Sequence, residues 1–188
     1  MNDANDQSWI RATWAAPQTI VAGTTLRTFA DGELPVATEP CRLNQVHGNR
    51  VVAARHYDVP PDADGSFSSS ADILCTVRTA DCMPVLLCSR DGSEFAAAHA
   101  GWRGMAAGII ENTVASLDTD GPDRLAWLGP AISQARFEGG DEVREAFVSD
   151  NAAAASAFEQ NDRGRWQADL YALARLRLAA AGVDDVAG

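Results

Sequence analysis

The stretch Thr79–Gly104, with the sequence TADCMPVLLCSRDGSEFAAAHAGWRG, decides the predicted fold. The continuous apolar run Val85–Cys88 is typical of a strand that is covered on both faces. An Asp-Gly turn signal at Asp91 then leads into a second apolar segment, Phe95–His99. The glycine-flanked residues that follow this segment open a helix. The stretch therefore predicts two antiparallel strands followed by the first turn of a helix.

The rest of the chain shows further strand and helix patterns on either side of this stretch. Strands are expected at Thr19–Leu26, Ala71–Thr79 and Leu125–Ile132, a hairpin over Arg42–Ala54 with His47 at its tip, surface loops at Thr28–Pro40 and Asp58–Ser70, and helices at Met105–Leu117, Asp141–Val148 and Asp169–Ala181 with a stop at Gly182. Strands that alternate with helices and are followed by helices predict a mixed α/β or α+β layered fold. We expect residues 1–188 to form a single domain.

Composition and charge exclude several classes of protein. A hydrophobic content of 46% is typical of a globular chain, and a net charge of -11 argues against a protein that coats nucleic acid or an anionic membrane. No apolar run reaches the roughly 20 residues that a membrane span needs. The acidic, polar start Met1–Gln7 does not resemble a signal peptide, and the chain has four cysteines, so we expect a cytoplasmic protein without a disulfide scaffold.

Two imidazoles and one thiol are predicted to meet at the ends of neighbouring strands. Cys82 lies at the head of the first strand of the quoted stretch, His99 lies at the end of the second, and His47 lies 35 residues before Cys82. Two nitrogens and one sulfur suit Zn²⁺ and leave a fourth position open, as in catalytic zinc sites. The same atoms also fit a Cys82 nucleophile with His99 as its base and Asp81 or His47 as orienting group. An alternating strand would turn Asp81 away from Cys82, which makes this second reading the weaker one.

The helix entry at Gly101 and Gly104 is a candidate anion site. Free backbone N–H groups at a helix start, together with the Arg103 guanidinium, can hold a phosphate close to His99. Asp64 and Asp72 are candidate carboxylates beside the site, although Asp64 is also typical of a turn residue.

Three segments together resemble the YfiH family. They are Asn44-Gln45-Val46-His47-Gly48, Thr79-Ala80-Asp81-Cys82-Met83-Pro84-Val85-Leu86 and Ala98-His99-Ala100-Gly101-Trp102-Arg103-Gly104, supported by Ala63-Asp64-Gly65, Leu128-Gly129-Pro130-Ala131-Ile132 and Phe137-Glu138-Gly139-Gly140-Asp141-Glu142-Val143. The resemblance implies a single-domain layered α/β/β/α sandwich with mixed sheets. It also implies a zinc ion on His47, Cys82 and His99.

The activity that the resemblance implies is phosphorolysis of adenosine, inosine, guanosine and methylthioadenosine, with adenosine deamination as a side activity. Purine nucleosides and phosphate would then be the partners, with Cys82, His99, His47 and Arg103 as catalytic residues and Asn44, Gln45, Arg103 and Gly104 as substrate contacts. One alternative is a peptidoglycan editing hydrolase that acts on muropeptide precursors containing L-serine. Another is an inactive metal-binding domain.

Members of the family were first labelled laccase-type polyphenol oxidases, but a copper oxidase is disfavoured here. Multicopper centres need many histidines, and this chain has three. Compared with the family pattern, the chain is short in the loop between Arg27 and Cys41 and at its C-terminal end. We expect these differences to alter the wall of the substrate pocket and to leave the three candidate metal ligands in place.

Overall fold

Six strands of mixed direction form the centre of the computed structural model, which describes residues 8–27 and 38–188. The strands are β4 (Val51–Ala53), β5 (Gly65–Ser68), β7 (Met83–Ser89), β8 (Phe95–Ala100), β9 (Arg124–Leu128) and β13 (Asp185–Ala187), in the order β13-β9-β7-β8-β5-β4. The outer pairs β13/β9 and β4/β5 are parallel, and the inner pairs are antiparallel. The predicted strand pair of the quoted stretch is confirmed as β7 and β8.

The register of the inner strands brings several strand ends to one edge of this sheet. Pro84 near the start of β7 lies opposite His99 near the end of β8. Gly65 at the start of β5 lies opposite Ala98, and the parallel strand β4 starts at the same level as β5. The segments that precede β4, β5 and β7 therefore meet the end of β8.

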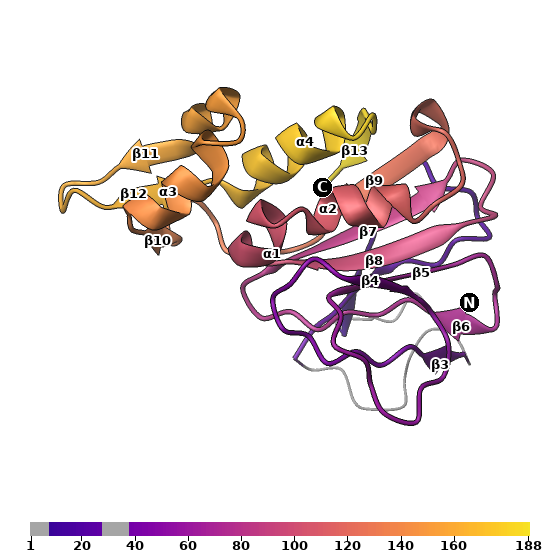
Figure 1. The fold of residues 1–188 in the computed structure, drawn as a ribbon. Coiled ribbons are helices and arrows are strands. Elements are labelled where there is room, and N and C mark those ends of the chain that lie inside the picture. The colour runs from indigo at the N-terminus through magenta and orange to yellow at the C-terminus, as the bar shows by residue number, and fades with distance from the viewer. Residues whose placement is uncertain (1–7, 28–37) are drawn as a thin grey trace.

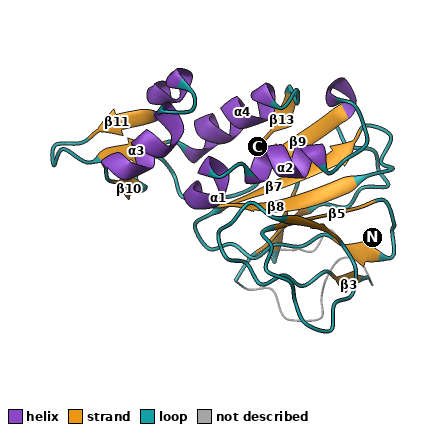
Figure 2. Cartoon of the chain, in the orientation of Figure 1, coloured by secondary structure: helices purple, strands orange, loops and turns teal. Residues whose placement is uncertain are grey.

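Helices cover one face of the sheet (Figures 1 and 2). They are α1 (Trp102–Ala106), α2 (Ile109–Ala115) and α4 (Leu170–Ala180), with a short 3₁₀ turn η1 (Gly121–Asp123) before β9. The prediction of one continuous helix over Met105–Leu117 is wrong, because Gly108 adopts a left-handed φ of 94° between α1 and α2. The apolar positions that predicted it are nevertheless buried against the sheet: Met105, Ile109, Ile110, Val114 and Leu117.

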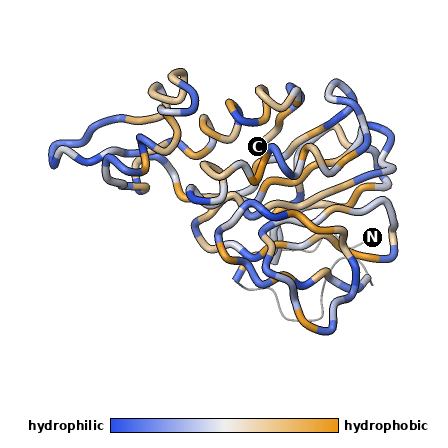
Figure 3. Tube along the Cα trace, viewed as in Figure 1, coloured by the Kyte–Doolittle hydropathy of each residue, from blue (hydrophilic) through white to orange (hydrophobic). Residues whose placement is uncertain are grey.

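The C-terminal third contains more strand than the sequence predicted. Helix α3 (Asp141–Val148) has the predicted bounds, but it is followed by the 3₁₀ helix η2 (Ala152–Ala157) and the hairpin β11 (Phe158–Gln160) and β12 (Trp166–Ala168). With β10 (Glu138–Gly139) this hairpin forms a three-stranded sheet, which extends from the side of the main sheet in Figure 1. The tip beyond β11 and β12 is hydrophilic in Figure 3. Helix α4 (Leu170–Ala180) begins one residue later than predicted, because Asp169 caps it: its side chain accepts the N–H of Ala172.

Short strands and loops lie on the other face of the main sheet (Figure 1). They include the pair β1 (Trp9–Arg11) and β2 (Gly23–Thr25) and the pair β3 (Glu39–Pro40) and β6 (Ile73–Leu74). The strands expected at 19–26 and 71–79 shrink to β2 and β6. Residues 28–37 of the expected loop at 28–40 lie outside the described residues.

The predicted hairpin over 42–54 and the predicted loop at 58–70 are both wrong, because a strand from each segment pairs with the other. The expected hairpin over 42–54 does not form, because β4 pairs in parallel with β5 instead of with the segment before it. Strand β5 itself lies inside the expected loop at 58–70. The fold class is confirmed as mixed α/β with mixed sheets. None of the helices in the described ranges is long and apolar enough to cross a membrane.

Candidate functional site

His47, Cys82 and His99 converge at the sheet edge where the strand ends meet. Their candidate ligand atoms all lie within 4.8 Å of one another. His99 belongs to β8 and is 4% exposed, Cys82 directly precedes β7 and is partly buried, and His47 lies in the exposed loop before β4. The two imidazole rings meet edge to face with their centroids 4.8 Å apart.

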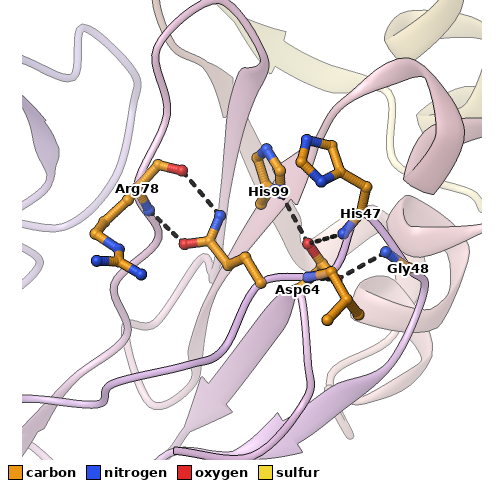
Figure 4. A network of polar contacts seen from close by, with 7 residues as sticks. His47, Gly48, Asp64, Arg78 and His99 are labelled. Carbon is orange, nitrogen blue, oxygen red and sulfur yellow. Dashed lines mark hydrogen bonds and ion pairs between the residues drawn. The ribbon is translucent and has the colours of Figure 1, made fainter.

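Asp64 lies beneath the two histidines as a fully buried carboxylate (Figure 4). It accepts hydrogen bonds from the backbone N–H groups of Val46, His47 and Gly48, at 3.1, 3.0 and 2.8 Å. It also contacts Nδ1 of His99 at 2.8 Å. Burial alone would raise the pKa of Asp64, but these hydrogen bonds outweigh it and lower the pKa. The carboxylate is therefore ionised, and it accepts hydrogen bonds both from the His47 loop and from His99.

The interpretation of Asp64 as a turn residue understated its contacts. It directly precedes β5, and its own carbonyl accepts the backbone N–H of His99 at 2.7 Å. Asp64 thus holds His99 through both its side chain and its main chain. The sequence signal was an acidic residue between Ala63 and Gly65 in an expected loop, which alone does not reveal its partners.

Burial and two neighbouring carboxylates act on the thiol of Cys82. Burial raises its pKa, and the neighbouring Asp81 and Asp64 raise it further, whereas Arg103 lowers it. The expectation that Asp81 faces away from Cys82 is wrong, because β7 begins only at Met83 and Asp81 hydrogen-bonds the thiol from the preceding bend. A raised thiol pKa makes a metal-free nucleophile weak.

Two glycines let the backbone approach the site closely. A Cβ on Gly101 would lie 2.7 Å from Sγ of Cys82 and 3.3 Å from Cδ2 of His47. A Cβ on Gly104 would lie 2.7 Å from the carbonyl oxygen of Gly48. Gly104 is buried, so it packs beneath the His47 loop.

The expected substrate amides are engaged with the protein itself. The Gln45 side chain donates to the carbonyl of Arg78 at 2.8 Å and accepts the N–H of Arg78 at 2.7 Å. Asn44 donates to the Asp62 carboxylate at 2.6 Å. These contacts connect the His47 loop to the segments before β5 and β7.

Arg103 is exposed and its guanidinium lies 4.5 Å from the Trp102 ring centroid. Its positive charge lowers the pKa of the Cys82 thiol, against the larger effects of burial and of Asp81. Because α1 has five residues, its dipole adds little to the expected anion site, which depends mainly on this side chain.

The candidate carboxylate Asp72 and the third histidine, His56, do not join the site. Asp72 is exposed and accepts from the hydroxyl of Ser70. His56 is exposed, with Asp58 at 3.9 Å. Both are surface residues.

The donor set of His47, Cys82 and His99 fits Zn²⁺. A zinc ion takes nitrogen ligands at about 2.0–2.1 Å and sulfur ligands at about 2.3 Å, and three protein ligands leave a fourth position open. The separation of at most 4.8 Å needs small side-chain rotations to reach such distances. The carboxylate on Nδ1 of His99 is the outer partner that metal-bound histidines commonly have.

Comparison with known proteins identifies the family. Residues 19–188 match the family described as "Multi-copper polyphenol oxidoreductase laccase". The Pseudomonas aeruginosa protein named purine nucleoside phosphorylase PA4543 is 43% identical, and the match covers 96% of this chain and 86% of that protein. The Escherichia coli protein named purine nucleoside phosphorylase YfiH is 48% identical, over 86% of this chain and 66% of that protein.

Solved structures agree with this placement. The crystal structure of Neisseria meningitidis protein NMB0706 has a TM-score of 0.91 and 38% identity, covering 96% of this chain and 86% of that one. YlmD from Geobacillus stearothermophilus has a TM-score of 0.71 and 25% identity, covering 79% of this chain and 62% of that one. The chain therefore belongs to the laccase-like family that includes the YfiH proteins.

Proposed function

We propose that this chain is a zinc-dependent purine nucleoside phosphorylase for adenosine, inosine, guanosine and methylthioadenosine, with adenosine deamination as a side activity. The observation that carries the proposal is the convergence of His47, Cys82 and His99, whose candidate ligand atoms lie within 4.8 Å of one another. The names of the Pseudomonas aeruginosa and Escherichia coli relatives support the reaction class.

Phosphorolysis requires one bond exchange at the sugar. A phosphate oxygen forms a bond to C1′ while the bond from C1′ to the base nitrogen breaks, and the released base takes up a proton. Zinc on His47, Cys82 and His99 would supply Lewis-acid polarisation next to this exchange. Arg103 would hold the phosphate, since its exposed guanidinium has no carboxylate partner among the described residues and its positive charge acts on the Cys82 thiol.

The roles of the remaining candidates follow from their contacts. Asn44 and Gln45 would act by holding the His47 loop, because their amides already bond to Asp62 and Arg78. Gly104 would act through close packing beneath the loop. Substrate contact thus falls mainly on Arg103 and on the exposed face of His47.

The test is a chromatographic assay of the purified chain with adenosine or inosine, with and without phosphate, together with its metal content. We expect free base and a pentose 1-phosphate in the presence of phosphate, and bound zinc. Cys82→Ala should lose both zinc and turnover, because it removes the sulfur ligand. Cys75→Ala is the matched control, since Cys75 is a free thiol outside the site and should retain both.

Three results would contradict parts of the proposal. Full turnover by Cys82→Ala would exclude the assigned site. Stoichiometric zinc without nucleoside turnover would exclude the phosphorylase and direct the search to muropeptide precursors. Copper-dependent oxygen uptake that persists after zinc is removed would instead support the hypothesis of a copper oxidase.

A further inference from the structure

We propose that Asp64 is the positioning residue of this site, aligning both imidazoles before a metal ion or substrate arrives. This inference rests on the metal site of the proposed function. It concerns a residue that touches neither the metal position nor the substrate and acts through His47 and His99. Its basis is the set of four side-chain hydrogen bonds that converge on one buried carboxylate.

The first consequence concerns the tautomer of His99. An ionised carboxylate accepts hydrogen bonds and cannot donate them, so Nδ1 of His99 must carry the proton at the 2.8 Å contact. Nε2 then keeps its lone pair for a ligand. The backbone of His99 is held as well, since its N–H donates to the Asp64 carbonyl at 2.7 Å. Asp64 therefore fixes both the position and the protonated nitrogen of this ring.

The second consequence concerns the backbone of His47. This residue has a φ of 59°, in the left-handed region that a side chain other than glycine seldom adopts and that costs about 1–2 kcal/mol. Three successive N–H groups, from Val46 to Gly48, point into the Asp64 carboxylate in this conformation. The same carboxylate that orients His99 thus stabilises the turn that presents His47.

An asparagine has the shape of Asp64 but cannot make this set of contacts. Its amide offers one acceptor oxygen and one donor group, whereas four donors converge on the carboxylate. Whichever way the amide is turned, its NH₂ group faces either His99 or the His47 loop. Asp64→Asn must therefore misalign at least one imidazole without changing the volume of the side chain.

The variant experiment measures Zn²⁺ affinity by competition with a chromophoric chelator, with circular dichroism as a check of the fold. Loss of an outer-shell partner typically lowers metal affinity about 10–100-fold, and we expect this range for Asp64→Asn. Asp72→Asn is the matched control, because Asp72 is an exposed carboxylate outside the site, and it should bind zinc as the wild type does. Equal affinity of Asp64→Asn and wild type would overturn the proposal.

A second measurement needs no variant, so it remains valid if Asp64→Asn fails to fold. Nitrogen-detected NMR of the metal-free wild type at about pH 8.5, where an ordinary imidazole is neutral, reports the tautomer of His99. We expect the Nδ1–H form, and a predominant Nε2–H form would overturn the proposal. Zinc binding with the expected loss in Asp64→Asn, but without nucleoside turnover, would refute the proposed phosphorylase and leave the role of Asp64 intact.

Discussion

Gly101→Ala should remove the metal site while leaving the fold in place. Gly101 has φ −69° and ψ 159°, an extended conformation that alanine adopts without strain. The new methyl group would lie 2.7 Å from Sγ of Cys82 and 3.3 Å from Cδ2 of His47. The substitution therefore acts through contact with two of the three candidate ligands and not through the backbone.

The size of the effect follows from these distances. Non-bonded atoms prefer separations of about 3.5–4.0 Å, so Sγ of Cys82 must move by roughly 1 Å. Metal sites tolerate changes of about 0.2 Å in their ligand distances. Rotation of the Cys82 side chain relieves the contact at little cost to folding, but it takes the sulfur away from the two imidazoles. We expect Zn²⁺ affinity to fall at least as far as on loss of an outer-shell partner, about 10–100-fold.

The assay compares Gly101→Ala with Gly164→Ala in both zinc competition and urea unfolding. Gly164, at the hairpin between β11 and β12, has a left-handed φ of 70°, so alanine there should cost about 1 kcal/mol of unfolding free energy. Its zinc affinity should not change, because the hairpin lies away from the site. Gly101→Ala with wild-type affinity for zinc would refute the assignment of the sulfur ligand.

Two further substitutions test contacts elsewhere in the fold. Tyr171→Phe removes a hydroxyl that accepts the N–H of Ala131 and donates to the carbonyl of Gly129, and should lower the free energy of unfolding in urea by about 1–3 kcal/mol; an unchanged midpoint would show that water replaces it. Burial raises the pKa of Glu94, but hydrogen bonds from the side chain and backbone of Thr119 outweigh it and lower the pKa. The stability that Glu94 contributes is therefore complete above about pH 4.5 and lost as the pH falls through the lowered pKa. Glu94→Gln should flatten this part of the acid-unfolding curve, and an identical curve would contradict the assignment.

The buried elements could be predicted because their apolar pattern is local. The run Val85–Cys88 lies in the central strand β7, and the helices α3 and α4 form within a residue of their predicted bounds. The break at Gly108 was missed because the apolar spacing continues across α1 and α2 in spite of it. Glycine in a left-handed conformation interrupts the hydrogen bonding of a helix without disturbing that spacing.

The three side chains that converge at the site could be singled out from the sequence, but the residues that support them could not. His47, Cys82 and His99 stood out as rare side chains beside glycines and turns. The contacts of Asp64 depend on the parallel pairing of β4 with β5, which joins segments that the sequence pattern assigned to a hairpin and a loop. Long-range pairing of this kind leaves no periodic signal in a short, polar segment.

The two candidate histidine ligands and the candidate cysteine ligand have separate supports. Asp64 holds both histidine segments, whereas the bend that carries Cys82 is held from elsewhere, since the carbonyl of Asp81 accepts the N–H of Ile132 at 2.9 Å. Gln45 connects the two systems through its paired hydrogen bonds to the backbone of Arg78. A change at one support should therefore displace part of the donor set without unfolding the sheet. Metal affinity and the free energy of unfolding should accordingly respond to different substitutions, and measuring both on the same variants tests that separation directly.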